Sequence, residues 1–480
     1  MSPALCIATA YLSGTNLRLV RCAPEVQCTK TPPRCTEDCL VLNVFKPQEV
    51  TTKKSTIVFI HGGDYVQGYS GGLLYDCTSL VYNHDVVCVT LNYRLGALGF
   101  LYTSSKDDHI DGNYGAQDQQ LALQWVQANI AAFGGDPNSV TLFGQSAGAA
   151  SVAVQNAAPS SKGLFHRSMM LSNPFSLPMR DAWTWGSLEK EFAKQAGCKS
   201  SNDTAAADCL QALSADDVVT AQLAARHDVL DEWTKVIDLF MPWTPTVGTD
   251  FLPKQPLDMF HTGTLPDMTR PVILNTVQNE AVLFVWEALT TPMNAIEYDL
   301  LFEVLFAGNG GKVLKEFPLP ANATKDARLA ASHVGTLALM VCSGRYAMQG
   351  MTAPAYVSHF DHIMSFGPQV WGPNYTECDT VVCHGGDLPF WFHPNGTSLG
   401  IEYSPAEQNL SMSMQTYFTS FAKSGVPQPP TTTIDQGLRW PVFNMTDQVY
   451  MKFDTPENSL EYHAYSNECG FFDEIGYNFY

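Results

Sequence analysis

Short runs of apolar and β-branched residues alternate along the chain with segments that have helical spacing. Buried strands are predicted at 55–60, 86–93, 140–143, 169–171 and 272–276. A helix is predicted over 117–132, because apolar residues recur there at helical intervals: Leu121, Leu123, Val126, Ile130 and Phe133. It ends at the breaker sequence Gly134-Gly-Asp-Pro137. Strands that alternate with helices predict an α/β fold, with a mainly parallel central sheet and helices on both faces.

The pattern between about 180 and 240 is helical and rich in Ala, Glu and Gln. We interpret this segment as a helical cap inserted into the sheet fold and not as a separate domain. No repeat with a period of 20–50 residues occurs, and the Pro/Thr-rich stretch at 427–433 is too short for an interdomain linker. We therefore expect residues 1–480 to form a single α/β domain.

One segment predicts a nucleophile. The pattern Gly-x-Ser-x-Gly occurs at 68–72, 144–148 and 396–400. Only the copy around Ser146 follows a predicted strand and precedes a helix-compatible segment, which is the arrangement of a nucleophile elbow. Ser70 lies in a glycine-rich loop and Ser398 follows a turn signal, so neither fits. Ser146 is therefore predicted to be the nucleophile of a hydrolase.

Composition narrows the possible partners and the compartment. The formal net charge is -20, which argues against binding to nucleic acid or to anionic membranes. No apolar run is long enough to predict a transmembrane helix. The 13 cysteines favour an oxidising compartment, and no paired Cys-x-x-Cys spacing predicts a metal site. Because their number is odd, one thiol must stay unpaired within the chain, and Cys88 in its apolar run is the expected one.

Glycosylation sequons support secretion, although residues 1–14 make a poor signal peptide because they contain no basic region. The six predicted acceptors are Asn202, Asn322, Asn374, Asn395, Asn409 and Asn444.

Several motifs together resemble those of the type-B carboxylesterases, a family of the α/β-hydrolase superfamily that includes cholinesterases and fungal lipases. In chain order they are Thr36-Glu-Asp-Cys-Leu-Val-Leu-Asn-Val44, Phe59-Ile-His-Gly-Gly63, Asn92-Tyr-Arg-Leu-Gly96, Gly112-Asn-Tyr-Gly-Ala-Gln-Asp118, Phe133-Gly-Gly-Asp-Pro137, the elbow, Pro245-Thr-Val-Gly-Thr-Asp-Phe-Leu-Pro253, Asn279-Glu280 and His384-Gly385. The resemblance implies an α/β-hydrolase fold, a small-molecule ester as substrate and no cofactor.

The resemblance also implies a catalytic triad. Among the 12 histidines, His384 matches the family's general base, in a loop with two glycines that would let it approach Ser146. Glu280 falls at the family's acid position and gives the chain order Ser, Glu, His. Ala281 follows it where the family usually has glycine. Asp387 is the rival acid, but three residues from His384 we expect it to be a loop or capping group.

The oxyanion hole is expected at the backbone N–H groups of Ala147, Gly63 and Asp64. The family normally has Gly or Ala at the position of Asp64. A carboxylate near a developing oxyanion would oppose catalysis, so we expect it to point away from the site.

The remaining matches imply structural roles. Cys198 and Cys209 match a small disulfide loop of the family. Cys39 matches the second cysteine of the N-terminal loop, with Cys6 as the best-spaced partner and Cys22, Cys28 and Cys35 as rivals. Glu37 and Arg94 would form a buried ion pair, and Asp118 would anchor the helix after Asn113. The family has several dozen residues before this loop, so the chain is expected to be shortened at its N-terminus, or else to begin differently.

These features together predict a secreted serine carboxylesterase that works through an acyl-enzyme. A lipase or sterol esterase is less favoured, because the N-terminal loop is polar and contains proline. A cholinesterase is less favoured still, because Gln145 replaces the family's glutamate and residues 1–38 contain no tryptophan. A phenolic-acid esterase is compatible with the sequence. A non-catalytic binding protein of the same fold is the alternative from another functional class.

Overall fold

The computed structural model describes residues 6–11, 38–103, 110–200, 203–231, 241–306, 308–394, 399–429 and 437–477. At 6–11, 203 and 226–231 only the backbone is described. Glu37, Asn202, Asn395 and Ser398 therefore lie outside the described residues.

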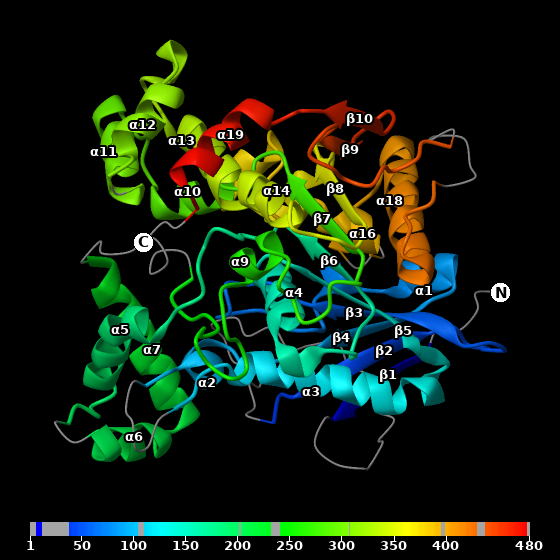
Figure 1. The fold of residues 1–480 in the computed structure, drawn as a ribbon, viewed down its shortest axis with the longest axis horizontal. Coiled ribbons are helices and arrows are strands. Elements are labelled where there is room, and N and C mark those ends of the chain that lie inside the picture. The colour runs from blue at the N-terminus through cyan, green and yellow to red at the C-terminus, as the bar shows by residue number, and fades with distance from the viewer. Residues whose placement is uncertain are drawn as a thin grey trace.

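A mixed, mostly parallel sheet runs through the centre of the molecule (Figure 1). Its strand order is β1-β2-β4-β3-β5-β6-β7-β8-β9-β10, and the pairs from β4 to β9 are parallel. The strands are β1 Cys6–Tyr11, β2 Val41–Lys46, β3 Lys54–Ile60, β4 Val87–Leu91, β5 Gly135–Gln145, β6 Arg167–Leu171, β7 Val272–Val277, β8 Ala355–Phe360, β9 Val449–Phe453 and β10 Ser459–Tyr462. The α/β-hydrolase fold with helices on both faces of a mainly parallel sheet is confirmed.

Most of the helices lie in the segments that connect these strands, and α19 follows the last strand. The α-helices are α1 Thr78–His84, α2 Gly96–Phe100, α3 Tyr114–Asn129, α4 Ala147–Ala157, α5 Ala182–Gln195, α6 Asp203–Gln211, α7 Ala215–Asp231, α9 Pro256–His261, α10 Val282–Ala288, α11 Ala295–Leu305, α12 Gly310–Glu316, α13 Arg328–Thr336, α14 Cys342–Met348, α15 Gly367–Trp371, α16 Leu388–Phe392, α18 Pro405–Ser424 and α19 Ser466–Ile475. A π-helix, Leu337–Val341, joins α13 to α14.

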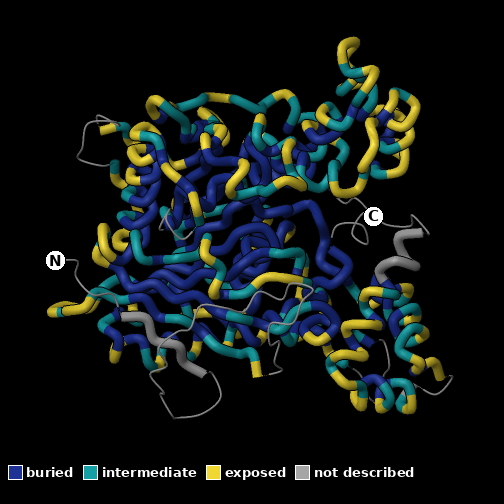
Figure 2. The backbone as a smooth tube through the Cα atoms, turned by 180° about the vertical axis from the view of Figure 1, so that it is seen from behind, coloured by how far each residue is buried: buried dark blue, intermediate teal, exposed yellow. Residues whose placement is uncertain are grey.

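The two faces of the sheet belong to two hydrophobic cores. Along β3, Ile57 and Phe59 pack into one core, while Val58 and Ile60 pack into the other, as the two-residue period of a strand requires. Residues of α1, α16 and α18 complete the first core, and residues of α3, α4, α9 and α14 contribute to the second. Figure 2 shows the result, with buried backbone in the sheet and exposed backbone in the outlying helices.

The predicted strands are all present, and the predicted helix is α3, followed by a 3₁₀ turn at Ile130–Phe133. One residue assigned to its apolar face lies elsewhere: Leu121 is 40% exposed, whereas Leu123 and Val126 are fully buried. The polar side chains of Asp118 and Gln119 are instead buried on the inner face of α3.

The segment predicted as a helical cap contains α5, α6 and α7. These helices form one group in Figure 1, and α10 to α13 form a second group on the same side of the sheet. The cap is attached through α7, where the Gln222 side-chain oxygen accepts a hydrogen bond of 2.7 Å from the N–H of Ala97 in α2.

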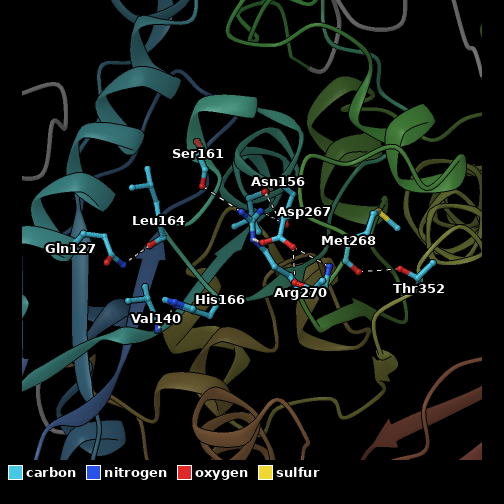
Figure 3. Close-up of polar contacts among 12 residues, drawn as sticks. Gln127, Val140, Asn156, Ser161, Leu164, His166, Asp267, Met268, Arg270 and Thr352 are labelled. Carbon is cyan, nitrogen blue, oxygen red and sulfur yellow. Dashed lines mark hydrogen bonds and ion pairs between the residues drawn. The ribbon is translucent and has the colours of Figure 1, made fainter.

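A buried arginine fixes the entry to β7 (Figure 3). The Arg270 side chain is 2% exposed, and its guanidinium lies 3.3 Å from the Asp267 carboxylate. It also donates to the Asn156 side chain and to the Ser161 carbonyl, both at 3.4 Å. The first residues of β7 are thereby tied to α4 and to the turn after it.

Four disulfides lie within the described residues: Cys77–Cys88, Cys198–Cys209, Cys342–Cys469 and Cys378–Cys383. The prediction that Cys88 is free is wrong, because β4 places it against Cys77 at the start of α1. The predicted partnership of Cys6 with Cys39 is not formed either, since the Cys39 thiol is free. Strand pairing explains this: β1 runs antiparallel to β2 with Cys6 opposite Lys46, at the end of β2 far from Cys39.

The other residues that the sequence singled out are placed as follows. Arg94 forms an ion pair with Asp118, with its Nε 2.7 Å from the carboxylate. Cys198, which follows α5, is joined to Cys209 of α6, as the resemblance implies. Four predicted glycosylation acceptors are exposed: Asn322, Asn374, Asn409 and Asn444.

Candidate active site

Ser146 occupies a sharp turn between β5 and α4. Its backbone has φ 59° and ψ -127°, a conformation that residues with a side chain rarely adopt. The turn is held by a hydrogen bond of 2.9 Å from the Ser146 N–H to the Leu171 carbonyl on β6. A Cβ atom at Gly144 would lie 2.3 Å from the Gly148 carbonyl oxygen, and one at Gly148 would lie 2.1 Å from that of Ile60. Both flanking glycines are therefore required by close packing.

The copy of the motif around Ser70 has different surroundings. Ser70 is buried in a hydrogen-bond network, where its hydroxyl accepts from Asn43 and its N–H donates to Asn92. No α-helix begins directly after it.

Glu280 and His384 are brought together from distant parts of the chain. Glu280 follows β7 and is fully buried, and its Oε1 accepts a hydrogen bond of 2.8 Å from the Val277 N–H. Its Oε2 lies 2.6 Å from Nδ1 of His384, which is 6% exposed. The ring of Phe284, on α10, packs against the imidazole with the ring centres 4.9 Å apart.

The charge around His384 favours its protonated form. Burial lowers the pKa of His384, whereas the charge of the Glu280 carboxylate and its hydrogen bond raise it. Asp64 and Asp387 add smaller effects in the same direction, so the net pKa lies above its ordinary value. An imidazole in this setting can accept a proton during a reaction and return it later.

The second ring nitrogen of His384 faces Gln145. Gln145 Nε2 and His384 Nε2 are 3.1 Å apart, so the amide donates and the ring nitrogen accepts. Within the described residues, no hydrogen bond joins the Ser146 hydroxyl to His384. The ring therefore carries its proton on Nδ1, toward Glu280, which is the tautomer that a general base requires.

Asp387, the rival acid, does not contact His384 by a hydrogen bond. Its Oδ2 accepts from Asn275 Nδ2 at 2.8 Å and from Trp391 Nε1 at 2.9 Å. Burial raises the pKa of Asp387 to about 6, with a further contribution from Glu280. Asp387 is the residue directly before α16, at the N-cap position.

The expected oxyanion donors lie on two sides of Ser146. Ala147 begins α4, and Gly63 and Asp64 follow β3 with φ of 107° and 54°. In the described ranges, the N–H groups of Gly63 and Ala147 have no acceptor in the protein. The loop passes very close to the elbow, because a Cβ atom at Gly62 would lie 2.9 Å from Cβ of Ser146.

A small cavity opens in front of Ser146. Its volume is about 280 Å³, including the part open to solvent. Two of the residues that line the cavity are polar or charged, Ser146 and Asp64. The other lining residues are apolar: Pro174, Leu177, Met241, Phe284, Leu339 and Met340. Leu339 and Met340 belong to the π-helix, a local irregularity that often occurs at functional sites. The described residues contain no group of three His, Cys, Asp or Glu that could hold a metal ion.

Two features of this site were not foreseen from the sequence. Gln145 was noted only as a departure from the family's glutamate, and its contact with His384 spans 239 positions. The Cys378–Cys383 disulfide lies directly before His384, and the signal for it was two cysteines only five positions apart.

The chain is similar to known proteins over most of its length. Residues 13–472 match the model of the Carboxylesterase family. The crystal protein of Dictyostelium discoideum is 34% identical over 457 residues, which cover 92% of this chain and 78% of that protein. The acylcarnitine hydrolase of Rattus norvegicus is 31% identical over 439 residues, covering 87% and 72%. Among solved structures, a PNB esterase superposes with a TM-score of 0.76 at 27% identity, covering 95% of this chain and 89% of that one.

Proposed function

The chain belongs to the carboxylesterase family and is a carboxylic ester hydrolase, and from this premise we propose that it works through an acyl-enzyme on Ser146, with His384 as general base and Glu280 as its acid. The observation that carries the proposal is the 2.6 Å contact between Glu280 and Nδ1 of His384, beside a serine on a strained elbow. The same three residues were chosen from the sequence.

The proposed reaction has two halves. Ser146 Oγ attacks the ester carbonyl carbon while His384 Nε2 takes the hydroxyl proton and then passes it to the departing alkoxide. Water then attacks the acyl carbon and loses a proton to Nε2, which passes this proton to Ser146 Oγ as the acyl–Oγ bond breaks, so that the carboxylic acid and the free Ser146 hydroxyl result. Gln145 has to release Nε2 for each transfer. Glu280 keeps its hydrogen bond to Nδ1 and stabilises the imidazolium that forms in each half.

In this proposal the backbone N–H groups of Gly63, Asp64 and Ala147 receive the oxyanion. The apolar lining of the cavity favours an uncharged acyl or alcohol group next to Ser146. The small volume favours short groups over long chains, which supports a carboxylesterase more than a lipase or sterol esterase.

Secretion and glycosylation belong to the proposal as well. The four described disulfides support passage through an oxidising compartment. The exposure of four sequon asparagines leaves them accessible to glycosylation. No described helix is both long and apolar enough to cross a bilayer.

The test is covalent labelling with a fluorophosphonate probe, followed by peptide mapping and a p-nitrophenyl ester series of increasing chain length. We expect the label on Ser146, and Ser146→Ala should lose both labelling and ester hydrolysis. Ser70→Ala is the matched control, because Ser70 lies in the same five-residue pattern, and it should still be labelled. An unlabelled wild-type protein would favour the non-catalytic alternative, and a label on Ser70 would overturn the assignment.

A further inference from the structure

The Cys378–Cys383 disulfide lies directly beside the proposed catalytic base. Cys383 immediately precedes His384, and Cys378 lies in the 3₁₀ turn Thr376–Asp379. Both cysteines are buried, with 2% and 1% of their surface exposed. The backbone that enters His384 is therefore closed covalently into a small loop.

The same backbone is paired with the segment that carries the acid. Asn279, the residue before Glu280, forms an isolated parallel bridge with Cys383. The Asn279 N–H donates to the Val382 carbonyl at 3.0 Å, and the Val382 N–H donates to the Asn279 side-chain oxygen at 3.2 Å. Glu280 follows Asn279 and His384 follows Cys383, so the two residues come directly after the two partners of one bridge. A shift of one backbone segment along the other would therefore change the distance between Glu280 and His384.

The disulfide is also part of a small hydrophobic cluster, separate from the two cores of the sheet. Its buried members are Val282, Cys378 and Cys383, and Leu283, Trp286, Trp371, Tyr375 and Val381 pack against them. Three of these residues lie on α10, the helix whose Phe284 contacts the His384 ring. In addition, the Tyr375 hydroxyl donates to Glu287 of α10 at 2.9 Å. The helix that carries Phe284 and the loop that enters His384 therefore both contribute residues to this cluster.

The size of the loop argues against a mainly global stabilising role. The two cysteines are 5 positions apart, whereas the other described disulfides join residues 11, 11 and 127 positions apart. The chain entropy that a disulfide removes from the unfolded state grows with the length of the loop, so this one contributes least by that route. Its location next to His384 is then the feature that needs an explanation.

We infer that the Cys378–Cys383 disulfide and the Asn279–Cys383 bridge together form a clamp that positions His384 against Glu280, so that turnover depends on the oxidation of this cysteine pair. The cysteines are positioning residues, because they touch neither substrate nor the reacting atoms. The inference rests on the proposed function of Ser146, Glu280 and His384.

The test compares two double variants, Cys378→Ala/Cys383→Ala and the control Cys198→Ala/Cys209→Ala, whose disulfide lies in the cap. For the clamp variant we expect kcat and the rate of fluorophosphonate labelling at Ser146 to fall about ten- to a hundredfold, because misplacing a catalytic group by about 1 Å has such an effect. KM should change by less than about twofold and Tm no more than in the control, since the cavity and the two sheet cores are unchanged.

A second variant, Asn279→Ala, keeps every cysteine and removes only the side-chain half of the bridge. It should lower kcat in the same way, and it decides the matter if the double variant does not fold. The inference would be overturned if a folded clamp variant had the wild-type kcat, or if kcat fell equally in the cap control. Either result would leave the triad assignment unchanged. Absence of labelling at Ser146 in the wild type would instead overturn the proposed function, and the inference with it.

Discussion

Replacing Glu280 by glutamine removes one charge from the buried pair and nearly preserves the shape of the side chain. The carboxylate and the imidazole are 2.6 Å apart and shielded from water. The attraction between them is realised only when His384 holds the serine proton, that is, in the transition states. We therefore expect kcat to fall in Glu280→Gln while KM stays close to the wild-type value.

The size of the loss follows from the geometry. Opposite unit charges about 3 Å apart attract by about 5 kcal/mol at an effective dielectric constant of about 20. Glutamine keeps a hydrogen bond to the ring, so we expect a net loss of about 3–4 kcal/mol, or about a hundred- to a thousandfold in kcat/KM. The loss becomes larger if the amide N–H group turns toward Nδ1, because the ring would then adopt the wrong tautomer.

The pH profile gives an independent readout. Glu280 raises the pKa of His384, so its neutralisation lowers that pKa. Because the base must be neutral to work, the acidic limb of kcat/KM should move to lower pH in Glu280→Gln. The assay is kcat/KM on one neutral p-nitrophenyl ester from pH 4 to about pH 9, a range that spans the ordinary pKa of histidine. Asp387→Asn is the matched control, and a severe loss there with a mild effect in Glu280→Gln would show that Asp387 is the acid.

Two further predictions concern other carboxylates. Asp64→Gly should be active with unchanged or higher kcat, and any gain should be largest at neutral pH, where the carboxylate is ionised. Measuring kcat against pH for both proteins on one neutral ester checks this prediction. A collapse of activity would mean that the carboxylate assists the reaction. Glu407→Gln should destabilise the fold: burial raises the pKa of Glu407, but hydrogen bonds from Ser365 and Ser404 lower it to about 2. The stability that Glu407 contributes is present above its ordinary pKa of 4.5 and is lost as the pH falls toward 2. Urea unfolding of both proteins at neutral pH and near pH 3 should therefore show a gap that narrows in acid, and a gap independent of pH would contradict the reasoning.

The sheet and the elbow could be predicted because their signals are local. A parallel strand covered on both faces is largely apolar, and β3, β4, β6 and β7 each contain an apolar run. The elbow needs glycine wherever backbones approach closely, so Gly144 and Gly148 mark it in the sequence. The positions of Glu280 and His384 came from the resemblance to a family, since neither residue is distinguished by its own neighbours.

The remaining features depend on distances that no local pattern encodes. The sequence around Cys88 is that of a buried strand, and it would be the same whether or not another cysteine lay within bonding distance. Cys77 comes within that distance only because α1 packs against the sheet. The free thiol of Cys39 follows from the register of β1 on β2, which sets Cys6 at the far end. That the chain forms one domain over 1–480 stays a prediction.

The backbone of Ser146 has a consequence for how this protein changes over generations. A serine in this conformation destabilises the native state by about 1–3 kcal/mol, whereas glycine adopts it freely. Folding alone would thus favour glycine at this position, and the hydroxyl that the proposed nucleophile requires is what opposes it. In a lineage no longer under selection for ester hydrolysis, Ser146→Gly would raise the stability of the native state and would not be selected against. Under the proposed function, a serine at position 146 is kept for its hydroxyl and against the conformational preference of the fold.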